Sequence, residues 1–135
     1  MIWTSSEQSY KKRDIGADTQ AKIEYADKYF RSIGMTDEQV LYTLAIIDHE
    51  SGGTWDETVV GDHGCSVGIA QYNTCAGNFP AKTYEGQVEQ VGKEMLARYQ
   101  KEPLLKAVIH HNMPSWDVNP NYEARIKASI KNFYK

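Results

Sequence analysis

Apolar residues recur every three or four positions in several stretches of the chain, the period of a helix with one buried face. The first expected helix runs from Asp18 to Ile33 and stops at Gly34, a residue typical of helix C-termini. The second begins at a Thr-Asp-Glu-Gln capping box, residues 36–39, and ends at Glu50 before two glycines. This capping box makes the second helix the best-defined element of the pattern.

Three more helices are expected towards the C-terminus. One covers Tyr84–Glu102 and is ended by Pro103, which suits the first turn of a fourth helix that reaches His111. The last begins at Asn119-Pro120, a capping residue followed by proline at the first helical position. Its buried stripe is expected to consist of Tyr122, Ile126, Ile130 and Phe133.

The segment between the two groups of helices, residues 51–80, holds six of the ten glycines and shows little periodicity. It is too long for a simple connector, and long loops of this kind commonly carry function. Weak alternation at Val67–Tyr72 allows a short strand, and a small hairpin is the largest sheet that we expect. Residues 1–16 have no clear period and are expected to form an irregular arm before a single, mainly α domain at 17–135.

Length and charge limit the classes of function. A chain of 135 residues can bury one core of its own, and its net charge of −3, with both signs mixed, leaves no basic stripe for nucleic acid. The longest apolar run, Val40–Ile47, is too short to cross a bilayer, and Met1–Trp3 opens no targeting segment. We therefore expect a soluble chain that neither binds nucleic acid nor inserts into membranes.

Cys65 and Cys75 lie ten residues apart, on either side of the sequence Gly68–Gln71. In an oxidising compartment a bond between them would close a small loop and stabilise the fold by about 2 to 3 kcal/mol. In a reducing compartment they would remain small side chains. The sequence leaves both states open, and we favour the disulfide.

Glu50 is the first candidate for chemistry. At 100° per residue it lies about 60° from Ile47 and about 40° from Ile46 around the helix, so its side chain should border the apolar stripe, half out of water. Burial disfavours the charged form of a carboxyl, and we expect Glu50 to keep its proton to a higher pH than an exposed Glu does. A protonated Glu can donate to a leaving oxygen. A solvated Glu at a helix end is the ordinary alternative.

Four motifs in this order carry a family resemblance: His49-Glu50-Ser51, Gly61-Asp62-His63-Gly64, Gly68-Ile69-Ala70-Gln71 and His110-His111-Asn112. Over roughly residues 36–134 the chain resembles glycoside hydrolase family 23, which holds the goose-type lysozymes and the soluble lytic transglycosylases. The resemblance implies a lysozyme-like helical fold with a long Gly-rich active-site loop. It also implies cleavage of peptidoglycan glycan strands at the β-1,4 bond between N-acetylmuramic acid and N-acetylglucosamine, without a cofactor.

Two carboxyl groups and one amide bear on the reaction type. By resemblance Glu50 is the general acid, and Asp62 matches a goose-type Asp that helps to position a water, where transglycosylases have a hydroxyl residue. Goose-type enzymes carry a second Asp where this chain has Asn73, whose amide can hold a water but cannot take its proton. Hydrolysis is favoured by a small margin, and a lytic transglycosylase that forms 1,6-anhydro ends with the same Glu50 is the alternative.

Further residues match the family's substrate-binding positions. Gln71 matches a cleft Gln, although it could equally bond the backbone of its own turn. Asn112 matches the Asn of the family's Ala-Tyr-Asn motif, and His111 stands where the family has Tyr. His111 could take over that contact, but we favour a solvated side chain. Tyr122 matches an aromatic of the cleft, and its place on the buried stripe favours packing.

Trp55 and Trp116 lie in loops that border the expected cleft. Aromatic faces often stack on sugar rings, and we expect one of these two side chains to contact the substrate. Filling the core is the more common use of Trp.

Two other classes of protein compete with the enzyme. A metal site is conceivable because possible ligands crowd one region, but their spacing matches no standard zinc pattern. Those residues are Asp48, His49, Asp62, His63, Cys65 and Cys75. A non-catalytic glycan-binding protein of the same fold is the second rival, disfavoured by the presence of both Glu50 and Asp62. We expect a monomeric enzyme that is secreted, periplasmic or carried on a virion.

Overall fold

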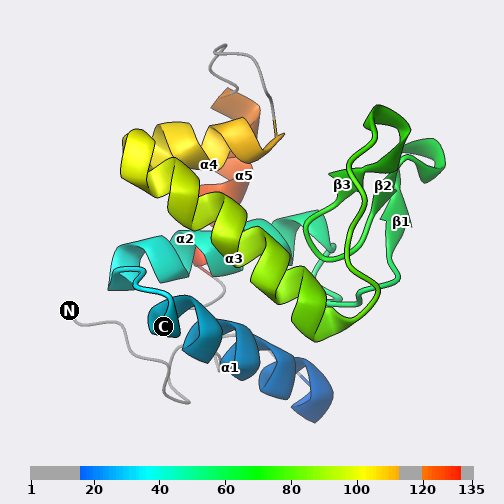
Figure 1. Cartoon of the computed structure of the whole chain (residues 1–135), viewed down its shortest axis with the longest axis horizontal. Coiled ribbons are helices and arrows are strands. Elements are labelled where there is room, and N and C mark those ends of the chain that lie inside the picture. Colours follow the sequence, from blue (N-terminus) through cyan, green and yellow to red (C-terminus); the bar gives the residue numbers. More distant parts are fainter. Residues whose placement is uncertain (1–15, 113–119, 132–135) are drawn as a thin grey trace.

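The computed structural model describes residues 16–112 and 120–131, which form five helices and a small three-stranded sheet (Figure 1). The described part of the protein is therefore mainly helical, as expected. The helices are α1 Ala17–Ser32, α2 Asp37–Glu50, α3 Tyr84–Lys101, α4 Leu104–Asn112 and α5 Pro120–Ile130. None of the described helices is both long enough and apolar enough to cross a membrane. The expected N-terminal arm lies outside the described residues.

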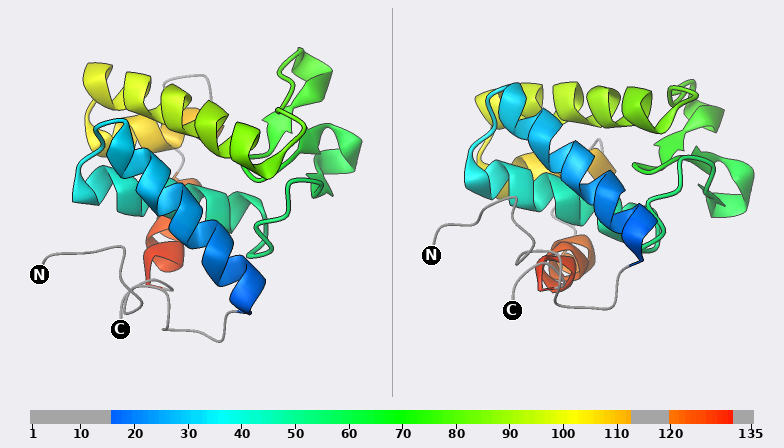
Figure 2. Two further views of the ribbon diagram at one scale, coloured as in Figure 1. Left: turned by 60° about the horizontal axis from the view of Figure 1, so that its bottom comes forward. Right: turned by 90° about the horizontal axis from the view of Figure 1, so that it is seen from below.

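Helix α2 lies at the centre of the helical part and packs against each of the other four helices (Figures 1 and 2). Its start is the predicted capping box: the Gln39 backbone N–H donates to Thr36 Oγ1 at 3.2 Å, and the Thr36 N–H donates to Gln39 Oε1 at 3.0 Å. Nearly every residue from Val40 to Asp48 is buried. Because α2 is surrounded, its C-terminal residue Glu50 has a fixed position in the fold.

The predicted helices α1, α3 and α4 are confirmed to within about two residues at each end, and α5 begins where predicted. Phe133, the last residue of the expected α5 stripe, lies outside the described residues. Gly34, with φ 104°, follows the end of α1, and Pro103 immediately precedes α4. On α5 the expected stripe is borne out by Tyr122 and Ile126, which are 2% and 1% exposed. Helical periodicity was informative here because each helix buries one face against α2 or its neighbours.

Residues 51–83, called the β-lobe from here on, form a separate small layer at the C-terminal end of α2 and the N-terminal end of α3 (Figure 1). The lobe holds strands β1 Val60–Gly61, β2 Ser66–Val67 and β3 Tyr72–Asn73, paired antiparallel in the order β1-β2-β3. The expectation of at most one hairpin is therefore wrong by one strand. A two-residue strand is too short for alternation of polar and apolar positions to show in the sequence.

A disulfide joins Cys65 to Cys75, with a Cα–Cα distance of 5.2 Å, which confirms the favoured prediction. The backbone N–H and the hydroxyl of Thr74 both donate to the Cys65 carbonyl, at 2.7 and 3.1 Å. The covalent bond and these hydrogen bonds hold β2 close to the segment that follows β3. The lobe is thus cross-linked between β2 and the residues after β3.

One buried side chain of α3, Gln87, ties the β-lobe to the helices. It is 3% exposed; its Oε1 accepts from the Ile69 N–H at 2.9 Å, and its Nε2 donates to the carbonyls of Glu57 at 3.0 Å and Ala81 at 2.9 Å. Gly68 lies against this amide, because a Cβ at that position would be 2.6 Å from Gln87 Oε1. A single amide therefore satisfies three backbone groups from separate parts of the lobe.

Replacing Gln87 by Leu should lower the free energy of unfolding by about 2 kcal/mol, because one buried and two partly buried backbone groups lose their partners. Urea denaturation followed by circular dichroism measures this loss. Gln100→Leu, on an exposed position of the same helix, is the matched control and should change stability by less than about 0.5 kcal/mol. Equal stabilities of the two variants would show that Gln87 does not anchor the lobe.

Candidate active site

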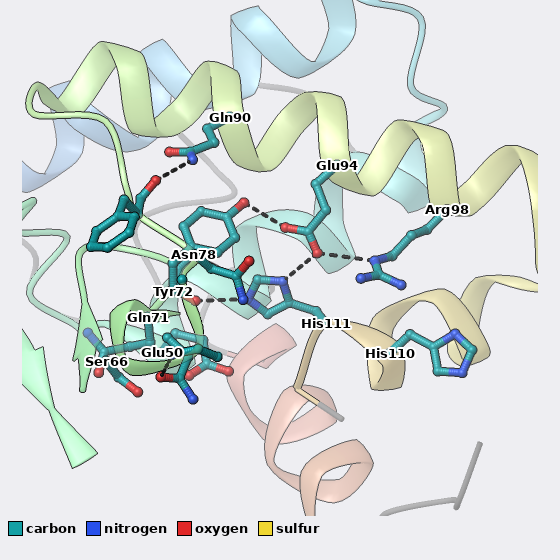
Figure 3. A pocket seen from close by; sticks show the side chains of 15 residues that line it. Glu50, Ser66, Gln71, Tyr72, Asn78, Gln90, Glu94, Arg98, His110 and His111 are labelled. Carbon is teal, nitrogen blue, oxygen red and sulfur yellow. Dashed lines mark hydrogen bonds and ion pairs between the residues drawn. The ribbon is translucent and has the colours of Figure 1, made fainter. Parts of the chain in front are cut away.

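An open cavity of about 830 Å³ lies between the β-lobe and the helices α3 and α4 (Figure 3). Its size is in the range of small-molecule and cofactor sites. Glu50 contributes from the end of α2, residues 66–79 from the lobe, and α3 and α4 supply the opposite wall. The candidate acid found in the sequence therefore faces a cleft.

Glu50 is the last residue of α2, and its half-buried position matches the prediction. Helix α2 ends there because Gly52 and Gly53 adopt positive φ angles of 64° and 79°, which glycine accommodates without strain. The Tyr122 hydroxyl donates to Glu50 Oε2 at 2.9 Å. Among the described residues, Glu50 Oε1 has no protein hydrogen-bond partner, so this oxygen is available to a ligand.

Tyr122 combines packing in the core with a contact in the cleft. Its ring is 2% exposed and packs in the core, as favoured, while its hydroxyl reaches Glu50. Burial, followed by the charge of Glu50, raises the pKa of Tyr122 above its ordinary value. The hydroxyl therefore stays protonated and orients the Glu50 carboxyl.

A second carboxyl in the cleft, Glu94 of α3, accepts three hydrogen bonds (Figure 3). The Tyr72 hydroxyl donates to its Oε1 at 2.6 Å, and Arg98 Nε and His111 Nδ1 lie 3.1 and 3.0 Å from its Oε2. Burial alone would raise the pKa of Glu94, but the charge and hydrogen bond of His111, the Tyr72 hydrogen bond and the charge of Arg98 lower it to about 2. Glu94 is therefore an ionised carboxylate at any ordinary pH.

His111 lies buried between two acceptors, with its side chain 3% exposed. Its Nδ1 faces the Glu94 carboxylate, and its Nε2 is 2.9 Å from the Ala70 carbonyl. Because neither acceptor can donate, both ring nitrogens carry a proton and the side chain is an imidazolium. Burial lowers the pKa of His111, but Glu94 raises it more, and the result is about 8. The favoured prediction of a solvated His111 is wrong.

The turn Gly68–Gln71 forms part of the cleft wall beside Glu50. Gln71 has a φ of 53°, and its Nε2 donates to the carbonyls of Gly68 at 2.9 Å and Val59 at 3.2 Å. The interpretation of Gln71 as a residue that bonds its own turn is confirmed, and the side chain also lines the cleft. Asn73 is exposed, lines the cleft and accepts from the Ala76 N–H at 3.1 Å. Contacts of these amides with substrate stay predictions.

The side chains of three predicted site residues lie outside the described part of the structure. Asp62 begins the turn Asp62–Gly64 after β1, and Asn112 ends α4, but their side chains are outside the described part of the structure. Trp116 lies outside the described residues altogether. A water held by Asp62 and sugar contacts by Asn112 and Trp116 remain predictions.

Trp55 does not border the cleft, so the prediction that it could stack on a sugar is wrong. It is 0% exposed, and its Nε1 donates to Asp48 Oδ1 at 3.0 Å. The Trp55 N–H donates to Ser51 Oγ at 3.0 Å, and the Gly53 N–H donates to the Asp48 carbonyl at 2.8 Å. These bonds turn the chain back at the end of α2 and carry the indole into the core.

The metal-binding alternative finds no support in the described part of the chain, where no group of three or more His, Cys, Asp or Glu side chains could hold an ion. Cys65 and Cys75 are bonded to each other, and Asp48 is buried against Trp55.

Several residues of the cleft were missed in the sequence, among them three on α3: Gln90, Glu94 and Arg98. The three recur every fourth residue along α3, beside its buried stripe. The available signal was a row of polar residues on one face of the helix, but such rows usually face solvent.

No family model, curated protein or solved structure matches this chain. The function is therefore argued from the cleft itself.

The Glu94–His111 pair predicts a pH dependence of stability. The pKa of His111 is raised from 6.5 to about 8, so its contribution is complete below pH 6.5 and is lost as the pH rises through about 8. The pKa of Glu94 is lowered from 4.5 to about 2, so its contribution is lost only as the pH falls below 4.5 towards about 2. Between roughly pH 6 and pH 9.5 the parent should lose about 2 kcal/mol through His111.

Urea denaturation at the two pH values tests this, with His111→Gln as the variant and His63→Gln, at an exposed histidine, as the control. His111→Gln should remove most of the loss between the two pH values, and His63→Gln should retain it. The same alkaline loss in all three proteins would mean that His111 does not titrate in this range.

Proposed function

We propose that this protein is a glycosidase that cleaves the β-1,4 bond between N-acetylmuramic acid and N-acetylglucosamine in peptidoglycan, with Glu50 as the general acid. The observation that carries the proposal is the placement of Glu50 at a large open cleft, with one oxygen held by a buried Tyr and the other facing no donor among the described residues. The motif order that resembles glycoside hydrolase family 23 supplies the substrate class. The lysozyme-like identity of the helical fold is part of the same proposal.

The first step needs a proton for the glycosidic oxygen, and Glu50 Oε1 is the group that would deliver it. General acid catalysis of this kind contributes about 10² to 10⁴ in rate. After the transfer Glu50 is a carboxylate, which the Tyr122 hydroxyl stabilises by its hydrogen bond at 2.9 Å. The His111 imidazolium is close enough for its charge to interact with that of Glu50, and it stabilises the same state.

The second step requires a nucleophile, and Glu94 is poorly suited to activate one. Its two oxygens accept from three donors, and a pKa of about 2 makes it a weak base. Asp62 is the remaining candidate to position a water, which gives a goose-type muramidase. In the alternative, a lytic transglycosylase, the 6-hydroxyl of the sugar attacks in place of water. The presence of Asp62 favours hydrolysis in this proposal.

Glu50→Gln should reduce the clearing of purified peptidoglycan by at least about 100-fold, because the amide cannot donate an acidic proton. Turbidity loss measures the activity, and circular dichroism verifies that the fold is retained. Glu38→Gln, an exposed Glu in the first turn of the same helix, is the matched control and should keep full activity. Full activity of the Glu50→Gln variant would remove Glu50 as the acid. A parent protein that binds peptidoglycan without cleaving it would favour the glycan-binding alternative.

Mass spectrometry of the released fragments separates the two chemistries. A hydrolase leaves reducing ends, and this is the expected result. Fragments lighter by one water, with 1,6-anhydro ends, would assign the protein to the lytic transglycosylases and leave the role of Glu50 unchanged.

Tyr122→Phe should lower kcat by about tenfold with little change in KM, because the lost hydrogen bond stabilises the carboxylate formed after proton transfer. Steady-state kinetics on soluble peptidoglycan fragments measure both constants. Tyr42→Phe is the control, since Tyr42 is half-buried and has no described hydrogen bond at its hydroxyl. Equal kcat values for both variants would show that Tyr122 only packs.

A further inference from the structure

Helix α3 lines the cleft with three side chains, one turn apart, whose charge changes along the groove. Gln90, Glu94 and Arg98 follow one another at intervals of four residues and span ~12 Å along the helix axis (Figure 3). Around Glu94 and Arg98 the wall is charged, because His111 also lies there. Around Gln90 the cleft is lined by the uncharged loop residues 76–79. The cleft therefore has one charged end and one neutral end.

The neutral end exposes an aromatic side chain, Phe79. It is 68% exposed, the most exposed of the large hydrophobic residues in the described chain, and it lines the cleft. A solvent-exposed apolar ring loses the stabilisation that burial would provide. An exposed Phe in a polar groove is thus a candidate contact for a ligand.

The loop that carries Phe79 is held in place. Gln90 Nε2 donates to the Phe79 carbonyl at 2.8 Å (Figure 3), and Gln90 Oε1 accepts from the Ala81 N–H at 2.8 Å. The Asn78 N–H donates to the Asn73 carbonyl at 3.0 Å, and the disulfide at Cys75 fixes the start of the loop. The backbone beneath the ring is therefore ordered before a ligand arrives, which lowers the entropic cost of binding.

We propose that Phe79 is the platform of a binding subsite for an uncharged pyranose ring at the Gln90 end of the cleft. The inference rests on the proposed function for the presence of a glycan in this groove. An aromatic face packs against the C–H face of a sugar, and the neighbouring amide of Asn78 offers both a donor and acceptors for hydroxyl or acetamido groups. Because the described residues that line this end carry no charge, an N-acetylglucosamine unit suits the subsite and an acidic sugar does not.

The chemistry of the groove distinguishes a glycan from a peptide as the occupant. A sugar carries many hydroxyls around small apolar faces, and the exposed ring of Phe79 among amide groups matches that distribution. An apolar peptide would need a contiguous hydrophobic patch. The cleft offers Phe79 together with three amide side chains that also line it, those of Asn73, Asn78 and Gln90.

Isothermal titration calorimetry with chitotetraose, a neutral oligomer of N-acetylglucosamine, tests the subsite. The Glu50→Gln protein serves as the parent so that the ligand is not cleaved. Adding Phe79→Ala should weaken binding by roughly three- to tenfold, and Phe79→Tyr should preserve it because the aromatic face remains. Val60→Ala, which trims another exposed apolar side chain outside the cleft lining, is the control and should bind like the parent.

The proposal is overturned if the parent does not bind chitotetraose, or if Phe79→Ala binds it as tightly as the parent does. It is also overturned if Val60→Ala weakens binding equally. Binding through Phe79 without cleavage of peptidoglycan by the native chain would leave the subsite in place and reject the proposed enzyme. If cleavage depends on Glu50 but Phe79→Ala binds chitotetraose as tightly as the parent does, the subsite is rejected and the proposed enzyme is retained.

Discussion

The ion pair between Glu94 and His111 is the interaction on which the cleft depends. It joins α3 to α4, and through the second ring nitrogen of His111 it reaches the Ala70 carbonyl in the turn of the β-lobe. Glu94 also holds the hydroxyl of Tyr72 in β3. Removing Glu94 would leave the charge of the buried His111 side chain without its ion-pair partner, which costs far more than an exposed ion pair contributes. The lobe is thereby fixed to the helices at the floor of the groove.

Two different forces place the two sides of the site. Apolar burial places Glu50, since α2 is surrounded by the other helices and ends at the groove. On the opposite wall polar contacts are added to apolar burial: Trp55, Ile69 and Ala70 of the lobe join the core, and Gln87 and Glu94 of α3 bond the lobe directly. A lobe held by directional bonds keeps its shape only while those bonds are satisfied. Glu50 and the wall formed by the lobe thus meet at the cleft.

The helices could be predicted because each buries a stripe with the period of 3.6 residues, and the capping box at Thr36 marks a boundary by local chemistry. The half-buried position of Glu50 followed from the same geometry. Trp55 and His111 were misjudged because their partners are set by tertiary structure: the indole turns back to Asp48, and the imidazole meets Glu94 and Ala70 across the fold. Local sequence carries no signal for such long-range polar contacts.

The protonation of His111 tests most directly whether the cleft floor is held by an ionised pair. Nuclear magnetic resonance of the protein labelled with ¹⁵N in its histidine rings, recorded across a pH titration, reports the state of each ring nitrogen. We expect both nitrogens of His111 to stay protonated until the pH approaches about 8, the value to which Glu94 raises the pKa of this side chain. A neutral ring at pH 6, with one nitrogen lacking a proton, would contradict it, because the ring could then not donate to both Glu94 and Ala70.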